Sequence, residues 1–294
     1  NKLISITQIS EGCFGNCTYC KTRLAKGALF SYPEKEILSS IESDLKNGAK
    51  EVWVTSQDNA NYGMDDKKQR LPELLTKILE LKHRFKLRIG MMDPNNVLPI
   101  LEELISTYKN KKMYKFIHIP IQSTSNNVLT DMNRLYTIEQ AEKLIQKFRK
   151  QIPEITISTD IIVGYPTETK QDHEKNVEFI KKFKPDVFNL SKMSIHKGTI
   201  ANKLKPLNIK IINKRTTELM KLHRQTAKQN KEKFLNKKTK AFVNKKLQDN
   251  LYQARDDNYN IILITSNDKS ILGKILEVKI KQIGIHHMIG EIIK

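Results

Sequence analysis

The feature that most limits the fold of this chain is a regular alternation of short β-rich runs with longer helix-periodic segments between residues 3 and 193. Six strands are expected, at Leu3–Ile9, Glu51–Thr55, Lys86–Met91, Lys115–Ile121, Thr156–Val163 and Val187–Ser191. The expected helices are Pro33–Asn47, Leu71–Arg84, Asn95–Tyr108, Thr137–Gln151 and Glu168–Phe183. Because the strands are nearly continuous in apolar residues, the repeated units predict a parallel sheet covered by helices.

Six strand–helix units are too few for a closed eight-fold barrel. They fit either an open, partial (β/α)6 barrel or a doubly wound sheet. In both folds the active and ligand-binding residues lie beyond the carboxyl ends of the strands. Cap signals mark several helix ends: we expect Ser31 to cap the first helix, Gly48 to stop it, and Asp93 and Thr137 to open later helices.

The pattern changes in the last third of the chain. A long basic helix is expected from about Asn213 to Asn236, followed by five short strands. The strands are Thr239–Lys245, Leu251–Asp256, Ile261–Ile264, Lys274–Ile283 and His287–Ile293. Their spacing predicts a small all-β, antiparallel barrel of OB-like character with hairpin turns. We therefore expect an α/β domain over 1–231 and a second domain over 232–294.

Positive charge is concentrated in this same region. The net charge is +20, and residues 203–250 alone hold 15 Lys or Arg against 3 Asp or Glu. Such a block attracts polyanions, RNA above all, although a solvated lysine-rich surface explains it equally well. No apolar run approaches the roughly 20 residues that span a bilayer. The start of the chain lacks a signal-peptide pattern, so no membrane and a cytoplasmic location are expected.

Cys13, Cys17 and Cys20 are the chain's three cysteines, spaced C-x3-C-x2-C directly after the first strand. A disulfide framework is disfavoured by their odd number and by the absence of an export signal. Zinc prefers a fourth Cys or His, and the nearest histidine in the sequence is His83. Three thiolates suit a [4Fe–4S] cluster whose fourth iron stays open, able to chelate S-adenosylmethionine (SAM). Reductive cleavage of SAM there gives a 5′-deoxyadenosyl radical.

Five segments carry a resemblance to a known family. They are "CTYCKTRLAKGALFSYP", "VTSQDNANYG", "FIHIPIQSTSNNVLTDMNRLYT", "ISTDIIVGYPTETKQDHEKNVEFI" and "MSIHKGTIANKL". In this order they resemble the signatures of the radical SAM superfamily and, within it, of the tRNA methylthiotransferases. The stretch "KTRLAKG" is most similar to the archaeal and eukaryotic branch, which acts on N6-threonylcarbamoyladenosine next to the anticodon.

The resemblance implies a fold, a reaction and partners. It favours the partial (β/α)6 barrel and makes the small barrel a TRAM domain, an RNA-binding module. The implied reaction adds a methylthio group to C2 of N6-threonylcarbamoyladenosine at position 37 (t6A37) of tRNAs that read ANN codons. The implied cofactors are SAM and the [4Fe–4S] cluster, with a ferredoxin or flavodoxin as electron donor. We expect a monomer.

Family members carry three further cysteines in an amino-terminal domain, for an auxiliary cluster that handles the inserted sulfur. This chain has only the three already named, so we expect that domain, with a second [4Fe–4S] cluster, to be absent from it. The alternatives are methylthiolation of isopentenyladenosine or of a ribosomal protein, and a non-catalytic RNA-binding protein with a structural zinc loop.

Residues at the ends of the predicted strands are candidates for SAM binding. The resemblance places Ser56, Gln57 and Asp58 at the SAM ammonium and Gln122 near SAM, although each set also fits an ordinary polar turn. Tyr19 would pack near the adenine and Gly164 would let the backbone approach the adenosine. Two further candidates are charged. Arg134 could bind the SAM carboxylate or form a surface ion pair, whereas Asp160 needs a ribose hydroxyl or a basic group as partner. His118 is given no role.

Candidate RNA-binding residues lie in the small barrel. They are Lys237, Lys238, Lys240, Phe242 and Arg255. Tyr252 and Tyr259 could also stack on bases, since aromatic rings next to cations suit RNA. Aromatic residues of a five-stranded barrel are more often part of its core.

Overall fold

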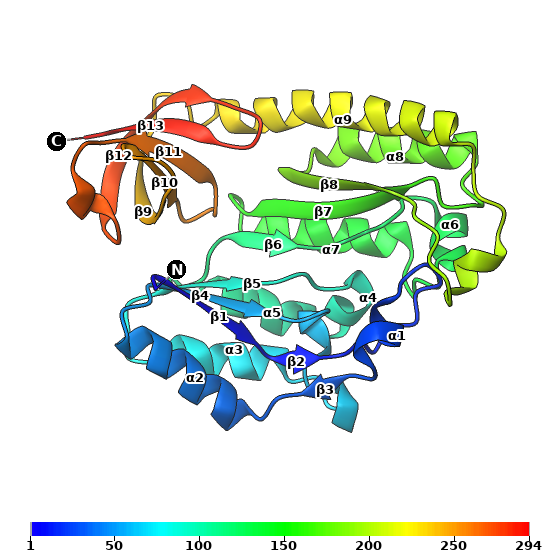
Figure 1. Ribbon diagram of the computed structural model, residues 1–294, viewed down its shortest axis with the longest axis horizontal. Helices are drawn as coiled ribbons and strands as arrows, with labels where there is room; N and C mark the ends of the chain where they lie inside the picture. Colours follow the sequence, from blue (N-terminus) through cyan, green and yellow to red (C-terminus); the bar gives the residue numbers. More distant parts are fainter. Residues whose placement is uncertain (1, 294) are drawn as a thin grey trace.

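The computed structural model describes residues 2–293. Its larger domain is built around six parallel strands. They are β1 (Ile4–Gln8), β4 (Glu51–Thr55), β5 (Lys86–Ile89), β6 (Phe116–His118), β7 (Thr156–Val163) and β8 (Val187–Lys192). Strands β1-β4-β5 and β6-β7-β8 form two parallel sheets, which a parallel bridge between Leu87 and Met113 joins. The strands therefore lie in sequence order around an open barrel (Figure 1), which confirms the partial (β/α)6 prediction and excludes the doubly wound sheet.

Helices cover the outer face of this barrel. They are α2 (Glu34–Lys46), α3 (Leu71–Glu80), α4 (Pro94–Val97), α5 (Leu101–Tyr108), α7 (Ile138–Gln151) and α8 (Lys170–Phe183). Val52, Val54, Leu87 and Ile89 point outward into the core beneath them and are fully buried. Since side chains alternate along a strand, the residues between them face the inside of the barrel.

Short elements complete this domain near the carboxyl ends of the strands. They are β2 (Ser10–Glu11), α1 (Thr22–Lys26), β3 (Phe30–Ser31), α6 (Asn126–Asp131) and the 3₁₀ turns η1 (Asn59–Asn61), η2 (Met64–Asp66), η3 (Leu98–Ile100) and η4 (Ile200–Lys203).

The helix caps are partly as expected. Asp93 Oδ1 accepts from the Asn95 N–H at the start of α4, and Thr137 forms a capping box with Gln140 at the start of α7. The prediction for Ser31 is wrong, because Pro33 occupies the N-cap of α2. The Ser31 hydroxyl instead donates to Asp65 Oδ1 at 2.6 Å.

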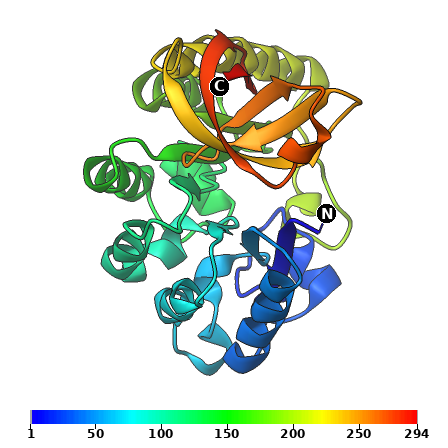
Figure 2. The same ribbon diagram turned by 90° about the vertical axis from the view of Figure 1, so that its left-hand side faces the viewer.

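Helix α9 (Ile209–Glu232) connects the open barrel to a closed five-stranded one. It runs along α8 and edge strand β8, and the small barrel lies at its far end, against the amino ends of the large barrel's strands (Figures 1 and 2). The small barrel comprises β9 (Lys238–Lys246), β10 (Leu251–Arg255), β11 (Ile261–Thr265), η5 (Lys269–Ile271), β12 (Ile275–Ile283) and β13 (Met288–Ile292).

One pair of strands differs from the expected antiparallel arrangement. Strands β11 and β13 pair in parallel, so β11 and β12 are not joined as a hairpin. The segment between them, which contains η5, crosses one end of the barrel and lets β12 pair with β9 to close it. No helix within residues 2–293 is both long and apolar enough to cross a membrane.

Aromatic rings join the two barrels. The turn between β10 and β11 places Tyr259 with its ring 4.9 Å from those of Tyr114 and Phe116 and 6.2 Å from that of Trp53. Asn244 of β9 donates to Glu51 Oε1 of β4 at 3.1 Å. The prediction that Tyr259 and Tyr252 are free to stack on RNA is therefore wrong: Tyr259 fills this junction and Tyr252 is buried in the small barrel's core.

Replacement of Tyr259 by Ala should lower the free energy of unfolding by about 2–3 kcal/mol, because it leaves a ring-sized void in the junction. Tyr259→Phe keeps the ring and should be close to neutral. Urea unfolding followed by the fluorescence of Trp53, the chain's single tryptophan, measures both variants. Equal stability of the two variants would show that the ring does not hold the barrels together.

Candidate functional site

The cysteine loop leaves the carboxyl end of the first strand and folds back on itself. Gly12 has φ +75°, and a Cβ there would lie 1.9 Å from the Ala28 carbonyl oxygen, so only glycine fits. The Cys13 N–H donates to the Gly27 carbonyl at 3.3 Å. The Thr18 N–H donates to the Met132 carbonyl at 3.1 Å, which ties the loop to the end of α6.

All three thiols line one cavity of about 480 Å³. Its opposite wall is Gly198–Ile200, in the loop after β8. Within residues 2–293 no three His, Cys, Asp or Glu side chains converge as a single metal ion requires. The thiols stand instead along the wall of a roomy cavity. A four-iron cube is larger than one ion and takes its ligands at separate corners, and thiolates are the ligands it prefers. The donor set and the space therefore fit a [4Fe–4S] cluster.

Burial disfavours the charged form of two of the thiols while no cation is bound. Burial raises the pKa of Cys13 to about 11, and burial also raises the pKa of Cys17. The Arg134 guanidinium opposes the shift of Cys17, because its Nη1 lies 3.5 Å from the Cys17 sulfur. The Thr22 N–H donates to the Cys20 sulfur at 3.4 Å. Bound iron would deprotonate these thiols, and the two donors would then stabilise the thiolates.

Arg134 is a buried link among three loops rather than a surface residue. Its side chain is 6% exposed, and Nη1 pairs with Asp93 Oδ2 at 2.7 Å. Its Nη2 donates to the Pro120 carbonyl at 3.0 Å, while Nε has no partner within the described residues. The alternative of a surface ion pair is therefore wrong. Binding of the SAM carboxylate stays a prediction, for which the buried, unpartnered Nε is available.

The three residues after β4 have separate tasks. The Asp58 carboxylate accepts from the backbone N–H groups of Ala60 and Asp93 and from the side chains of Asn61 and Asn96. Burial, with Asp93 nearby, raises its pKa to about 7. With these four hydrogen bonds Asp58 holds together the turn after β4 and the loop after β5.

Ser56 Oγ and Gln57 Oε1, in contrast, are buried atoms for which the described residues supply no hydrogen-bond partner. A buried hydroxyl and a buried carbonyl without partners cost free energy unless a ligand satisfies them. They fit an ammonium group better than Asp58 does.

Asp160 has the basic partner that the sequence predicted for it. His118 Nε2 lies 2.9 Å from Asp160 Oδ1, and Asn189 Nδ2 donates to the same oxygen at 2.6 Å. Both contacts are on the inner face of the barrel, so His118, which was given no role, belongs to the site. Gln122 has φ +69° and its N–H donates to the Asp160 carbonyl at 2.7 Å.

Tyr19 packs against a small apolar cluster beside the cysteine loop. The cluster contains Val128, Met132, Tyr165 and Ala201. Burial raises the pKa of Tyr19 well above its ordinary value, so its hydroxyl stays protonated at neutral pH. The Tyr165 hydroxyl is 2.8 Å from Thr18 Oγ1, which anchors the loop after β7 to the cysteine loop.

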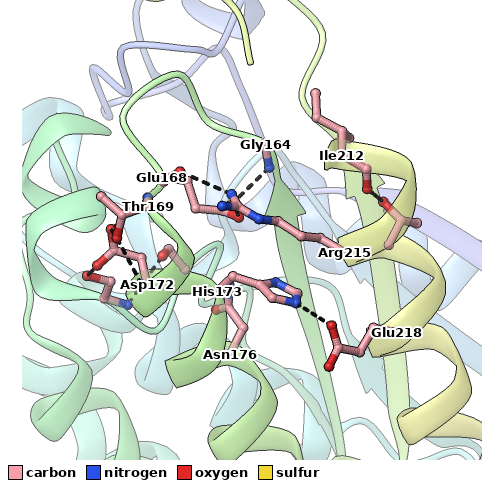
Figure 3. Close-up of polar contacts among 12 residues, drawn as sticks. Gly164, Glu168, Thr169, Asp172, His173, Asn176, Ile212, Arg215 and Glu218 are labelled. Atoms are coloured by element: carbon pink, nitrogen blue, oxygen red, sulfur yellow. Dashed lines mark hydrogen bonds and ion pairs between the residues drawn. The ribbon is translucent and has the colours of Figure 1, made fainter. Parts of the chain in front are cut away.

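The backbone at Gly164 closely approaches a helix. A Cβ at this position would lie 2.6 Å from the Ile212 side chain of α9, and the residue has φ +86°. Glycine here makes room for α9, and the approach of its backbone to adenosine stays a prediction. The Gly164 N–H donates to Glu168 Oε2 at 2.9 Å (Figure 3).

Glu168 and Arg215, which the sequence did not single out, fasten the loop after β7 to α9 (Figure 3). Arg215 Nη1 is 2.6 Å from Glu168 Oε1 and 3.0 Å from the Glu168 carbonyl. Both side chains are buried, at 1% and 11% exposure for Glu168 and Arg215. Glu168 comes two residues after the Gly164–Pro166 turn and Arg215 lies in a basic helix, and neither has a local sequence pattern that predicts their pairing.

Neighbouring contacts extend this clamp (Figure 3). His173 Nε2 of α8 lies 3.0 Å from Glu218 Oε2 of α9. Asp172 completes the capping box of α8 with Thr169 and accepts from the Ser125 hydroxyl at 2.5 Å. The loop after β6 that contains Gln122, the loop after β7 and α9 are thus one hydrogen-bonded unit.

The candidate RNA-binding residues divide into two groups. Lys237, Lys238 and Lys240 are exposed. Phe242 is buried, and Arg255 stacks on the Tyr259 ring at 3.8 Å while its Nη1 donates to the Tyr259 carbonyl. The prediction of Phe242 as a free stacking platform is wrong.

Two adjoining cavities of about 640 and 460 Å³ lie at the seam between the barrels, and we call them the seam groove. Its basic residues are Lys50, Arg84, Lys86, Lys109, Lys111, Lys112, Lys115, Lys240 and Arg255. Asp257 is its only acidic lining residue among residues 2–293, and it pairs with Lys86 at 2.7 Å. Such a groove is strongly electropositive.

Comparison with known proteins identifies relatives over nearly the whole chain. Residues 7–180 match the model of the radical SAM superfamily. A probable threonylcarbamoyladenosine tRNA methylthiotransferase of Archaeoglobus fulgidus is 38% identical over 98% of this chain and 67% of its own length. The Homo sapiens threonylcarbamoyladenosine tRNA methylthiotransferase is 34% identical over 99% of this chain and 50% of its own length.

Solved structures support the fold alone, because their sequence identities are low. The radical SAM methyltransferase TsrM from Kitasatospora setae, with cobalamin and a [4Fe–4S] cluster bound, has a TM-score of 0.56 at 16% identity and covers 67% of this chain and 36% of its own. Coproporphyrinogen III oxidase of Escherichia coli, a radical SAM enzyme, has a TM-score of 0.56 at 13% identity over 95% of this chain and 66% of its own.

Arg215→Met should lower the free energy of unfolding by about 3–5 kcal/mol, because it leaves the Glu168 carboxylate buried without a cation. Burial already raises the pKa of Glu168, and Arg215 opposes that shift. The variant's native state therefore holds its proton to higher pH than its unfolded state does. Its stability should fall as pH rises from 5 to 8, measured by urea unfolding.

The double variant Arg215→Met with Glu168→Gln removes the charge and should lose this added pH dependence. The same pH profile for Arg215→Met and wild type would contradict the clamp.

Proposed function

We propose that this chain, which belongs to the radical SAM superfamily and, within it, to the threonylcarbamoyladenosine tRNA methylthiotransferase family, adds a methylthio group to C2 of N6-threonylcarbamoyladenosine at position 37 of tRNA. The observation that carries the proposal is the set of three thiols on one cavity wall, at the carboxyl edge of an open barrel. The names of its relatives supply the substrate.

Cys13, Cys17 and Cys20 would hold the [4Fe–4S] cluster. When bound, the cluster supplies the electron that cleaves SAM to a 5′-deoxyadenosyl radical, which abstracts hydrogen from the substrate. Arg134 keeps the Cys17 sulfur in place and adds positive charge beside it. Its two further contacts, to Asp93 and Pro120, prevent the guanidinium from moving when a ligand enters.

SAM itself would be oriented by groups that the fold leaves unsatisfied. Ser56 and Gln57 would accept from its ammonium group, and Arg134 Nε would donate to its carboxylate. Asp160 uses Oδ1 for His118 and Asn189, and its other oxygen can accept from a ribose hydroxyl. Gln122 and Tyr19 flank this position from the loop after β6 and from the cysteine loop.

The sulfur must come from elsewhere, because the three cysteines are all engaged. The chain spans about two thirds of its archaeal relatives and about half of its human one. We propose that an auxiliary [4Fe–4S] cluster, in the region of those relatives that lies outside the match, supplies the methylated sulfur.

RNA would be held by the second domain together with the basic residues of the first domain that line the seam groove. We propose that residues 232–294 act as the RNA-binding unit and residues 1–231 as the radical-forming unit, with ANN-decoding tRNA as substrate. Lys237, Lys238 and the seam groove would contact phosphates. We further propose that the protein works as a monomer in the cytoplasm and takes electrons from a ferredoxin or flavodoxin.

The reaction is tested in a strain that lacks the protein. Complementation with the wild-type gene should restore the methylthio form of threonylcarbamoyladenosine in digested tRNA, measured by mass spectrometry, whereas Cys17→Ala should restore none. Purified under anaerobic conditions, the wild type should contain iron and sulfide and release 5′-deoxyadenosine from SAM. About one zinc per chain and no iron would favour a binding protein instead. Product on isopentenyladenosine would move the substrate to that alternative.

The seam groove is tested by removal of its charges. The triple variant Lys109→Ala, Lys111→Ala, Lys240→Ala should bind tRNA more weakly, and the slope of log affinity against log salt should shrink by about 2–3, since up to three phosphate contacts are lost. Lys35→Ala, Lys46→Ala, Lys143→Ala removes the same charge from residues of α2 and α7 that do not line the groove, and should leave the slope near the wild-type value. Equal effects of the two triple variants would exclude a specific role for the groove.

A further inference from the structure

The inside of the open barrel contains an arginine that no carboxylate neutralises. Arg88 lies on β5 between Leu87 and Ile89, which are fully buried toward the helices. Because side chains alternate along a strand, Arg88 points to the inner face, where its register neighbour on β4 is Trp53.

The surroundings of Arg88 are aromatic. Its guanidinium carbon lies 5.5 Å from the ring centre of Phe116, 5.8 Å from that of Tyr259 and 6.0 Å from that of Trp53. Its Nε is buried without a hydrogen-bond partner, and none of the ion pairs between residues 2 and 293 includes Arg88.

The one buried carboxylate of this cluster, Glu51, does not serve as the missing partner. Its Oε1 accepts from Tyr114 at 2.6 Å and from Asn244 at 3.1 Å, and its Oε2 accepts from Trp53 at 2.9 Å. A half-buried cation with an orphaned N–H is costly, and an anionic ligand would offset that cost.

Arg88 lies within reach of a base that is held at the catalytic edge. Arg88 is one residue before the end of β5. Its register neighbour Trp53 comes three residues before Ser56 and four residues before Gln57. At about 3.3 Å per residue, Arg88 is roughly 10 Å below the groups that would orient SAM. Access is open, because Ile6, on the inner face of edge strand β1, is 64% exposed.

We propose that Arg88 binds the carboxylate of the threonylcarbamoyl group and so selects this nucleoside, an inference that rests on the proposed function. The threonine of that group is joined through its nitrogen, which leaves its carboxylate free as an anion on N6 of the base. A guanidinium matches a carboxylate with two parallel hydrogen bonds. An isopentenyl group is a hydrocarbon and would leave Arg88 unpaired.

The experiment measures binding rather than catalysis. Fluorescence anisotropy gives the affinity of the protein for a synthetic anticodon stem-loop with threonylcarbamoyladenosine and for the same RNA with the threonyl carboxylate as its methyl ester. The wild type should prefer the free carboxylate about 10-fold, the effect of one charge-assisted contact. Arg88→Met keeps the length of the side chain but not its charge, and should bind both RNAs equally, with the affinity for the ester unchanged.

Arg70→Met is the matched control. Arg70 forms an exposed ion pair with Asp66, outside both the barrel interior and the seam groove, and its loss should leave the 10-fold preference intact. A preference retained in Arg88→Met, or no preference in the wild type, overturns the proposal. If Arg88→Met does not fold, Arg88→Lys decides: its preference should fall below the wild-type value, and an unchanged preference overturns the assignment.

The two proposals fail in different ways. If the complete, reconstituted enzyme forms no methylthio product while the carboxylate preference depends on Arg88, the proposed reaction is wrong and the Arg88 site stands. If product forms but Arg88→Met keeps the preference, only the Arg88 site is wrong.

Discussion

The buried guanidinium of Arg134 is the contact on which the arrangement of the site depends. It touches the Cys17 sulfur, the Asp93 carboxylate and the Pro120 carbonyl, which belong to the loops after β1, β5 and β6. The three loops follow different strands and are far apart in the sequence. One cation that satisfies a thiol, a carboxylate and a carbonyl at once fixes their separations, because any displacement would leave a buried polar group unpaired.

A second buried ion pair connects the site to the helix that leads to the small barrel. Glu168 and Arg215 fasten the loop after β7 to α9, and Ile212 fills the space that Gly164 leaves. Helix α9 then runs to the small barrel, which Tyr259 locks against the amino ends of the strands. The position of the small barrel relative to the cysteine loop is therefore set by α9, which has a fixed contact at each end. A reaction that needs a radical and a base in van der Waals contact requires this kind of positioning.

The sequence predicted the parts of the structure that depend on local pattern. Strand and helix positions followed from periodicity, and the cysteine loop from its spacing, since both are properties of adjacent residues. The pairing of Arg134 with Asp93, the clamp of Glu168 and Arg215, and the partners of Asp58 join segments far apart in the chain. Local sequence patterns do not predict such pairs. The error at Tyr259 had the same origin: its ring was a candidate for stacking on RNA, whereas it meets a distant element of the same chain.

Buried polar groups whose hydrogen bonds are all made within the chain differ from those that lack a partner, and this difference separates structural residues from residues that face a ligand. Asp58, Glu168 and Glu51 are buried acids whose oxygens are all engaged within the chain. Other buried polar atoms near the inner face have no partner within the described residues. Ser56 Oγ and Gln57 Oε1 are acceptors without a donor. The Nε atoms of Arg134 and Arg88 are donors without an acceptor. A zwitterion such as the methionyl end of SAM satisfies the first three, with its ammonium on the acceptors and its carboxylate on Arg134. Two donors are left over, the Nε atoms of Arg88 and Arg255. Arg255 lies at the end of β10 beside Tyr259. Arg88 lies on the inner face of the large barrel and calls for a second anion, which the substrate rather than the cofactor would bring.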